Sequence, residues 1–339
     1  MPTAIAPLMN TSEELPTGDS SATGLLWGML SAVGYMFANL GLRGVAGANG
    51  SVADVDWAIW VSANKAAPVV LTAWTFVGWR ALRGLPALPP KRMVLPLILT
   101  GLFMQWGGNV SFQYSLSRAG LALTVPFAFS TILISAAIVG RLAIGDPLTR
   151  ATLFAIGMMI AAMTVLTRGT RAATQSLVSE SDLASAGLAV AAACLSGIAY
   201  GAGGVMIRRC VRGEISHSAT IVVLSTTGML TLGGTSLLRI GPQVLLSTPP
   251  DVWLKMLGAG MATAVAFFAI SGAYQHLSTV KVNLLNASQI AMSALAGVLL
   301  FNEPNTPWLR AGTALTIVGL ILSARRDAST AVCPDAADR

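Results

Sequence analysis

Several residue types that enzymes depend on are scarce in this chain: 10% of its residues are charged, two are histidine and three are cysteine. Neither His217 nor His276 lies in a His-Glu-x-x-His motif, which argues against a metalloprotease. No glycine-rich loop leads into Lys-Ser or Lys-Thr, so an ATP site is not expected. The cysteines suggest neither a disulfide nor a metal site. We expect a protein that is not an enzyme, with no catalytic residue, metal or cofactor.

Acidic side chains are also missing from the interior of the hydrophobic segments. All 14 lie at or between those segments, so no buried carboxylate offers itself as a proton carrier. The residues before Ala22 include acids but no Lys or Arg, unlike the basic start of a signal peptide. We therefore expect the first hydrophobic segment to act as its own insertion signal.

Long apolar segments dominate what is present. Hydrophobic residues make up 54% of the chain, there are 34 glycines, and the mean hydropathy is +0.69. A helix needs about 20 apolar residues to cross a bilayer. The sequence predicts ten such helices: Ala22 to Leu42, Trp57 to Trp79, Val94 to Leu116, Ala119 to Gly140, Ala151 to Thr167, Ala184 to Ile207, Ala219 to Ile240, Trp253 to Gln275, Thr279 to Phe301 and Trp308 to Ser323.

The basic residues indicate topology. A net charge of +7 would suggest nucleic acid for a soluble protein, but here Lys and Arg gather in short loops, above all Arg80 to Arg92 and Arg208 to Arg212. Such loops favour the cytoplasmic side. We expect an integral multi-pass protein of the bacterial inner membrane, with both termini cytoplasmic, that contacts lipid and no nucleic acid. The sequence leaves a homodimer open.

The second set of five segments repeats features of the first. Tyr114 and Tyr274 end the third segment of each set, and Ser31 to Tyr35 compares with Ser196 to Tyr200. Five is odd, so the halves insert in opposite orientations and meet near the midplane, where transporters hold their substrates. We expect an all-α membrane protein of two inverted five-helix repeats, with the division 1–21 polar N-terminus, 22–168 first repeat, 169–183 linker, 184–326 second repeat and 327–339 polar tail.

An acidic residue and a proline follow the fourth segment of each half, as Asp146-Pro147 and Glu303-Pro304, and a glycine-bearing segment comes next. With the repeat, this resembles the drug/metabolite transporter superfamily and its ten-helix proteins with two EamA-type domains. The resemblance implies that the first four helices of each half enclose a central cavity. Asp146 and Glu303 are expected to cap or brace loops, with Arg310 near Glu303.

Lys65 is the charged residue deepest inside a predicted segment, roughly 12 Å from Trp57 at helical rise. An intramembrane charge is a functional candidate, and an ammonium suits a carboxylate or a phosphate. The alternative is that its long stem reaches back to the interface.

Amide side chains form a stripe in each half that could bind a polar solute or join neighbouring helices. Tyr35 and Tyr200 are related by the repeat and could line or gate the same site. With Lys65, these are the candidate substrate-binding residues: Tyr35, Tyr200, Gln105, Asn109, Gln113, Asn283, Asn286 and Gln289.

These features predict a secondary transporter that exports a small polar or amphipathic metabolite by alternating access. Lys65 and the missing buried acids favour an amino-acid-like or other carboxylate solute. The alternatives are an organic-phosphate or nucleotide-sugar exchanger and a lipid flippase of the same fold.

Overall fold

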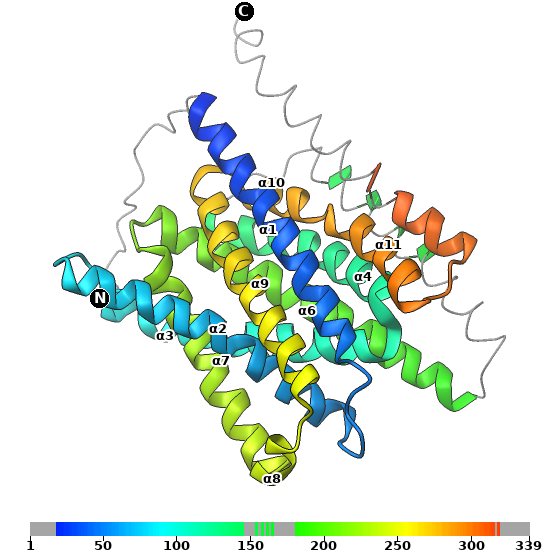
Figure 1. Cartoon of the computed structure of the whole chain (residues 1–339). Helices are drawn as coiled ribbons and strands as arrows, with labels where there is room; N and C mark the ends of the chain where they lie inside the picture. The colour runs from blue at the N-terminus through cyan, green and yellow to red at the C-terminus, as the bar shows by residue number, and fades with distance from the viewer. Residues whose placement is uncertain are drawn as a thin grey trace, which may run out of the picture.

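The computed structural model describes residues 18–145 and 180–315, together with 153–154, 157–158, 161–162, 164–165 and 317–318. Every element in these ranges is helical (Figure 1). In chain order they are α1 (Gly18–Gly44), α2 (Asp54–Leu82), α3 (Lys91–Leu102), the π-helical η1 (Phe103–Val110), α4 (Ser111–Ile144), α6 (Glu180–Arg212), α7 (His217–Arg239), α8 (Pro242–Leu246), α9 (Pro250–His276), α10 (Thr279–Asn286) and α11 (Gln289–Phe301).

Within the described residues, six helices are long and apolar enough to cross a membrane: Ala22–Gly44, Lys91–Ile144, Ala184–Arg212, His217–Arg239, Pro250–His276 and Thr279–Phe301. The chain is therefore an integral multi-pass membrane protein. α2 is not in this set, because Asn64, Lys65 and Pro68 make its middle more polar. Ten spanning helices remain a prediction. Most of the expected fifth helix and of the linker, the whole tail and Asp146-Pro147 lie outside the described residues, as do residues 316 and 319–323 of the expected tenth helix.

The predicted boundaries between helices differ from the structure in two places. The expected third and fourth helices follow each other without a loop, and a break at Gly120, with φ 72° and ψ 179°, separates them. The expected ninth helix divides into α10 and α11 after Asn286. Hydropathy alone does not locate either change, because long apolar stretches flank both places closely.

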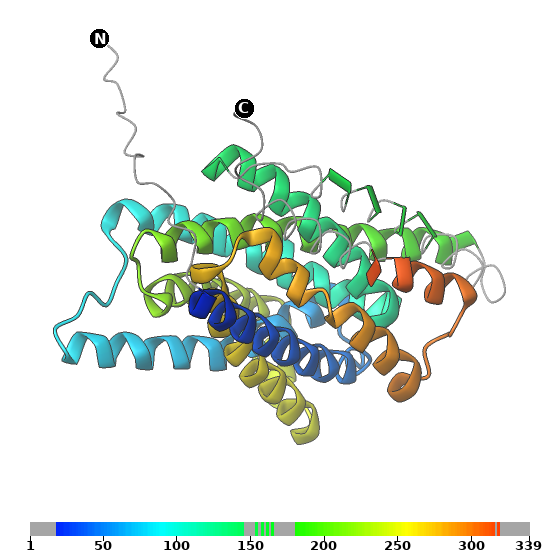
Figure 2. The same ribbon diagram turned by 90° about the horizontal axis from the view of Figure 1, so that it is seen from above.

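Helices from the two ends of the chain pack together in pairs. α1 lies along α9, α6 lies along α4, and α2 packs against α7 (Figures 1 and 2). Small residues make the closest approaches possible. Gly34 of α1 meets Ala262 and Ala266 of α9, while Gly197 of α6 meets α4 so closely that a Cβ atom would overlap Thr131 and the Ala128 carbonyl.

Gly197→Ala should destabilise the protein by about 1–3 kcal/mol, because the added methyl group forces α6 away from α4. The control is Gly187→Ala in the same helix, where nothing lies within 4 Å of the added carbon. Thermal unfolding in detergent should show a lower midpoint for Gly197→Ala alone. Equal midpoints for the two variants would contradict this account of the α4–α6 contact.

Candidate functional site

A cavity of about 140 Å³ lies at the centre of the packed helices. Residues from α1, α2, η1, α4, α6, α7, α9, α10 and α11 line it, so both halves of the chain contribute. Eight of the predicted site residues lie in its wall: Tyr35, Lys65, Gln105, Asn109, Tyr200, Asn283, Asn286 and Gln289. The ninth, Gln113, does not.

Lys65 lies on α2 with only 7% of its surface exposed. Its Nζ donates a hydrogen bond to Asn109 Oδ1 of η1, so the side chain crosses to a neighbouring helix and does not follow the interface-directed alternative. α9 packs closely against α2 at this point, because Gly260 of α9 leaves no room for a Cβ atom beside the Lys65 carbonyl and the Pro68 ring. The Lys65 side chain therefore extends into the cavity from a segment of α2 whose backbone is closely packed against α9.

Asn109 is the centre of the polar cluster contributed by the first half. Its Oδ1 accepts from Lys65 and, at 2.6 Å, from the Tyr200 hydroxyl, while its Nδ2 donates to Gln105 Oε1. Gln105 Nε2 in turn donates to the Leu224 carbonyl at 3.4 Å. The cluster joins helices α2, η1, α6 and α7.

Gln113 lies outside the cavity wall, three residues beyond the π-helical η1. Gln113, the first amide after η1, donates instead to the Leu42 carbonyl at 3.3 Å. Such π-helical turns occur often at functional sites.

The second half contributes another cluster of amides. Asn286 Oδ1 accepts from the Ser31 hydroxyl at 3.0 Å and from Gln289 Nε2 at 3.1 Å. Gln289 Oε1 accepts from Asn39 Nδ2 at 3.2 Å. These bonds fix α10 and α11 to α1.

The sequence did not predict some of the residues that line the cavity. Asn39 faces the amide cluster four residues after Tyr35, one helical turn along α1. Tyr274 matches Tyr114 in the repeat, and the sequence pattern places it at the end of a helix without indicating a site. The remaining side chains that line the wall with these are mostly aromatic or apolar, among them Met104, Phe112, Phe129, Ile132, Thr263 and Phe267.

No acidic side chain lines the cavity within the part of the chain that the structure describes. Ion pairs there lie elsewhere, such as Arg239–Asp56 and Lys255–Asp251. The wall thus contains a lysine, amides and tyrosines, and among the described residues the Lys65 ammonium has an amide oxygen as its one hydrogen-bond partner.

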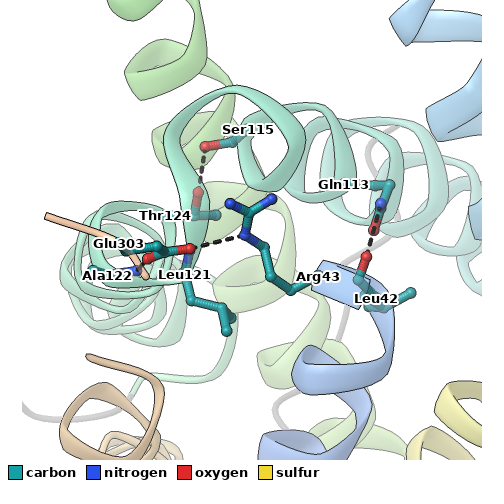
Figure 3. A network of polar contacts seen from close by, with 8 residues as sticks. All are labelled: Leu42, Arg43, Gln113, Ser115, Leu121, Ala122, Thr124 and Glu303. Carbon is teal, nitrogen blue, oxygen red and sulfur yellow. Dashed lines mark hydrogen bonds and ion pairs between the residues drawn. The ribbon is translucent and has the colours of Figure 1, made fainter. Parts of the chain in front are cut away.

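The signature acid of the second half, Glu303, lies outside the cavity and braces the break in α4. Its carboxylate accepts from the backbone N–H groups of Leu121 and Ala122, each at 2.8 Å, directly after Gly120 (Figure 3). Arg43 Nε of α1 donates to the same carboxylate at 2.8 Å. The expected bracing role is thus present, with Arg43 as its partner in place of Arg310.

Gly120 is required at this break for two reasons. Its φ of 72° belongs to the left-handed region that favours glycine, and a Cβ atom there would overlap the Glu303 carboxylate. The Ser115 and Thr124 hydroxyls, 2.9 Å apart, also join the two sides of the break (Figure 3). Asp146, the matching acid of the first half, lies outside the described residues.

An all-helical membrane protein with a polar central cavity is the class that these features define. Residues 187–325 match the model of the EamA-like transporter family. This match, which lies in the second half of the chain, supports membership of the drug/metabolite transporter superfamily and indicates a membrane transporter of that type.

A solved crystal structure is similar in fold, with a TM-score of 0.62 and 17% sequence identity, covering 92% of this chain and 99% of that chain. At this identity the likeness shows the fold alone. No curated protein matches the sequence.

Glu303→Ala should destabilise the protein by about 3–5 kcal/mol, because it leaves buried backbone N–H groups and Arg43 without their acceptor. Glu303→Gln should cost less, since its amide oxygen can still accept from one N–H group. The midpoint of thermal unfolding in detergent should fall in the order wild type, Glu303→Gln, Glu303→Ala. The exposed Asp251→Ala serves as control and should stay near wild type.

Proposed function

We propose that this protein is a secondary transporter that exports small amino-acid-like or other carboxylate solutes by alternating access, with the central cavity as the substrate site. The observation that carries the proposal is the position of Lys65. The Lys65 ammonium is buried, and no acidic side chain among the described lining residues neutralises it. An anionic solute bound there supplies the opposite charge.

The other candidate residues complete this site in the proposal. Lys65 binds the carboxylate, the amides of the two clusters contact polar groups of the solute, and Tyr35 and Tyr200 cover its apolar part. The mixture of aromatic and amide side chains in the wall suits a solute that is apolar at one part and polar at another.

Ten helices in two inverted repeats are part of the same proposal. The contacts are consistent with exchange of the halves: α1 packs on α9 as α6 packs on η1, and α2 packs on α7. In an inverted repeat α1 corresponds to α6, α2 to α7, and the segment containing η1 to α9. A two-fold relation would produce this set of contacts.

Alternating access requires an end that can open and close, and a cluster of ion pairs is a candidate. Arg43 contacts Glu303, Arg118 contacts Asp54, and Arg239 Nε lies 2.5 Å from Asp56 Oδ1. We call these contacts the outer ion pairs, because α1, α7 and α11 end there and we place both termini in the cytoplasm. In this arrangement the outer end is closed.

Lys65→Met should raise the KM for carboxylate solutes at least about tenfold, since a hydrogen-bonded charge is lost while the apolar stem is kept. Uptake and counterflow of labelled amino acids and organic acids in proteoliposomes would measure this. Lys255→Met, which removes an exposed lysine paired with Asp251, should transport like wild type.

Carboxylate transport that is equal in Lys65→Met and wild type would contradict the proposed role of Lys65. Competition by sugar phosphates but not by carboxylates would instead favour an organic-phosphate or nucleotide-sugar exchanger. Movement of labelled lipid without any soluble solute would favour a flippase. Accumulation in everted but not in right-side-out vesicles would support export.

Asp56→Arg should open the outer end by placing like charges opposite each other at Arg239. The reporter is Leu42→Cys in the cavity wall, on a background with Cys194, Cys210 and Cys333 replaced by serine. A membrane-impermeant maleimide added outside should label this cysteine several-fold faster in Asp56→Arg.

The double variant Asp56→Arg/Arg239→Asp restores opposite charges and should restore slow labelling. Asp251→Arg is the control, because Asp251 pairs with Lys255 within α9 and joins no two helices. Equal labelling in Asp56→Arg and wild type would count against closure by these pairs.

A further inference from the structure

Asn283 of α10 holds an unused hydrogen-bond donor in the cavity wall. Only 4% of the residue is exposed, and its Nδ2 has no partner among the described residues. Buried amide N–H groups in proteins nearly always have an acceptor, so a lone one in a binding cavity points to an acceptor that arrives with a ligand.

Tyr274 determines which polar atom of the Asn283 amide remains without a partner. Its hydroxyl donates to Asn283 Oδ1 at 3.2 Å, so the oxygen is occupied and the N–H₂ group remains. Tyr274 itself is 2% exposed and well fixed. Gly204 of α6 makes room for it, because a Cβ atom at that position would lie 2.5 Å from the Tyr274 hydroxyl.

Four other amides of the wall use their oxygens as acceptors. Those of Gln105, Asn109, Asn286 and Gln289 each accept at least one hydrogen bond from within the protein, and Asn39 donates its Nδ2 hydrogen to Gln289. The wall also holds two donors with unused capacity, the Lys65 ammonium and Asn283 Nδ2. A site rich in donors and without an acid among its described residues suits a solute with two acceptors better than one with a free ammonium group.

We infer that Asn283 Nδ2 binds a second, uncharged oxygen of the transported anion, and that Tyr274, seated against Gly204, is the residue that positions this donor. The inference rests on the proposed function and narrows its solute class. The preferred solute is a carboxylate that also carries a hydroxyl, oxo or amide oxygen, with the carboxylate at Lys65 and the uncharged oxygen at Asn283.

Matched acids test this inference. The probes are the straight-chain acids from butyrate to octanoate and their terminal hydroxy derivatives, compared in pairs of equal chain length by counterflow in proteoliposomes. For at least one chain length, the wild type should show a KM about tenfold lower for the hydroxy acid than for its parent.

Asn283→Leu should abolish this preference by raising the KM for the hydroxy acid to that of its parent acid. Tyr274→Phe and Gly204→Ala should each reduce the preference, because the donor loses its fixed direction. The double variant Tyr274→Phe/Asn283→Leu should be no worse than Asn283→Leu alone.

A purely structural role would change transport of both acids of a pair alike. The inference is overturned if the wild type has no preference at any chain length, if Asn283→Leu retains the preference, or if Tyr274→Phe impairs both acids equally. Failure of the proposed function would give a different result. Wild type and Lys65→Met would then transport the parent acids equally, or neither would transport any carboxylate. Either result would also overturn the inference.

Discussion

Polar groups within the spanning helices must find their partners inside the protein, because hydrocarbon offers none. This constraint accounts for the helical architecture and for the features that depart from it. The break at Gly120 frees the N–H groups of Leu121 and Ala122, and the Glu303 carboxylate accepts from both. The EamA-type acidic residue thus allows a helix to change direction near the membrane without leaving backbone donors unpaired.

The same constraint gives meaning to the groups that remain unpaired. Lys65 has an amide oxygen for its ammonium but no carboxylate among the described lining residues, and Asn283 leaves one N–H₂ group unused. Around them, amides, hydroxyls and backbone carbonyls form two hydrogen-bonded clusters. A cavity whose own groups satisfy one another except for a few donors is selective, because a solute lacking matching acceptors would leave those donors desolvated and unpaired.

The sequence was a good guide to which residues meet and a poor guide to local backbone geometry. The position of apolar segments predicted most helix locations, and the charge of Lys65 and the spacing of the amides pointed to residues that line one cavity. The pattern could not reveal the π-helical turn of η1, and it placed Gln113 with the amides of the cavity, whereas its side chain donates to the Leu42 carbonyl. It also could not identify partners distant in sequence, such as Arg43 for Glu303 or Tyr274 for Asn283.

The helix contacts define two bundles that do not coincide with the two halves of the sequence. α1 and α2 pack on α9, with α1 also on α10 and α11, whereas α6 packs on η1 and α4 and α7 packs on α3; α10 and α11 also pack on α4 across the boundary between the bundles. Each half therefore lends its first two helices to the other, and α2 meets α7 where the bundles join. Asp54 and Asp56 of one bundle contact Arg118 and Arg239 of the other, and Glu303 joins Arg43 to the α4 backbone. If transport moves these bundles relative to each other, the outer ion pairs are the contacts that must separate. The Lys65–Asn109 bond also crosses between the bundles, so a solute that binds Lys65 in the cavity affects the same movement.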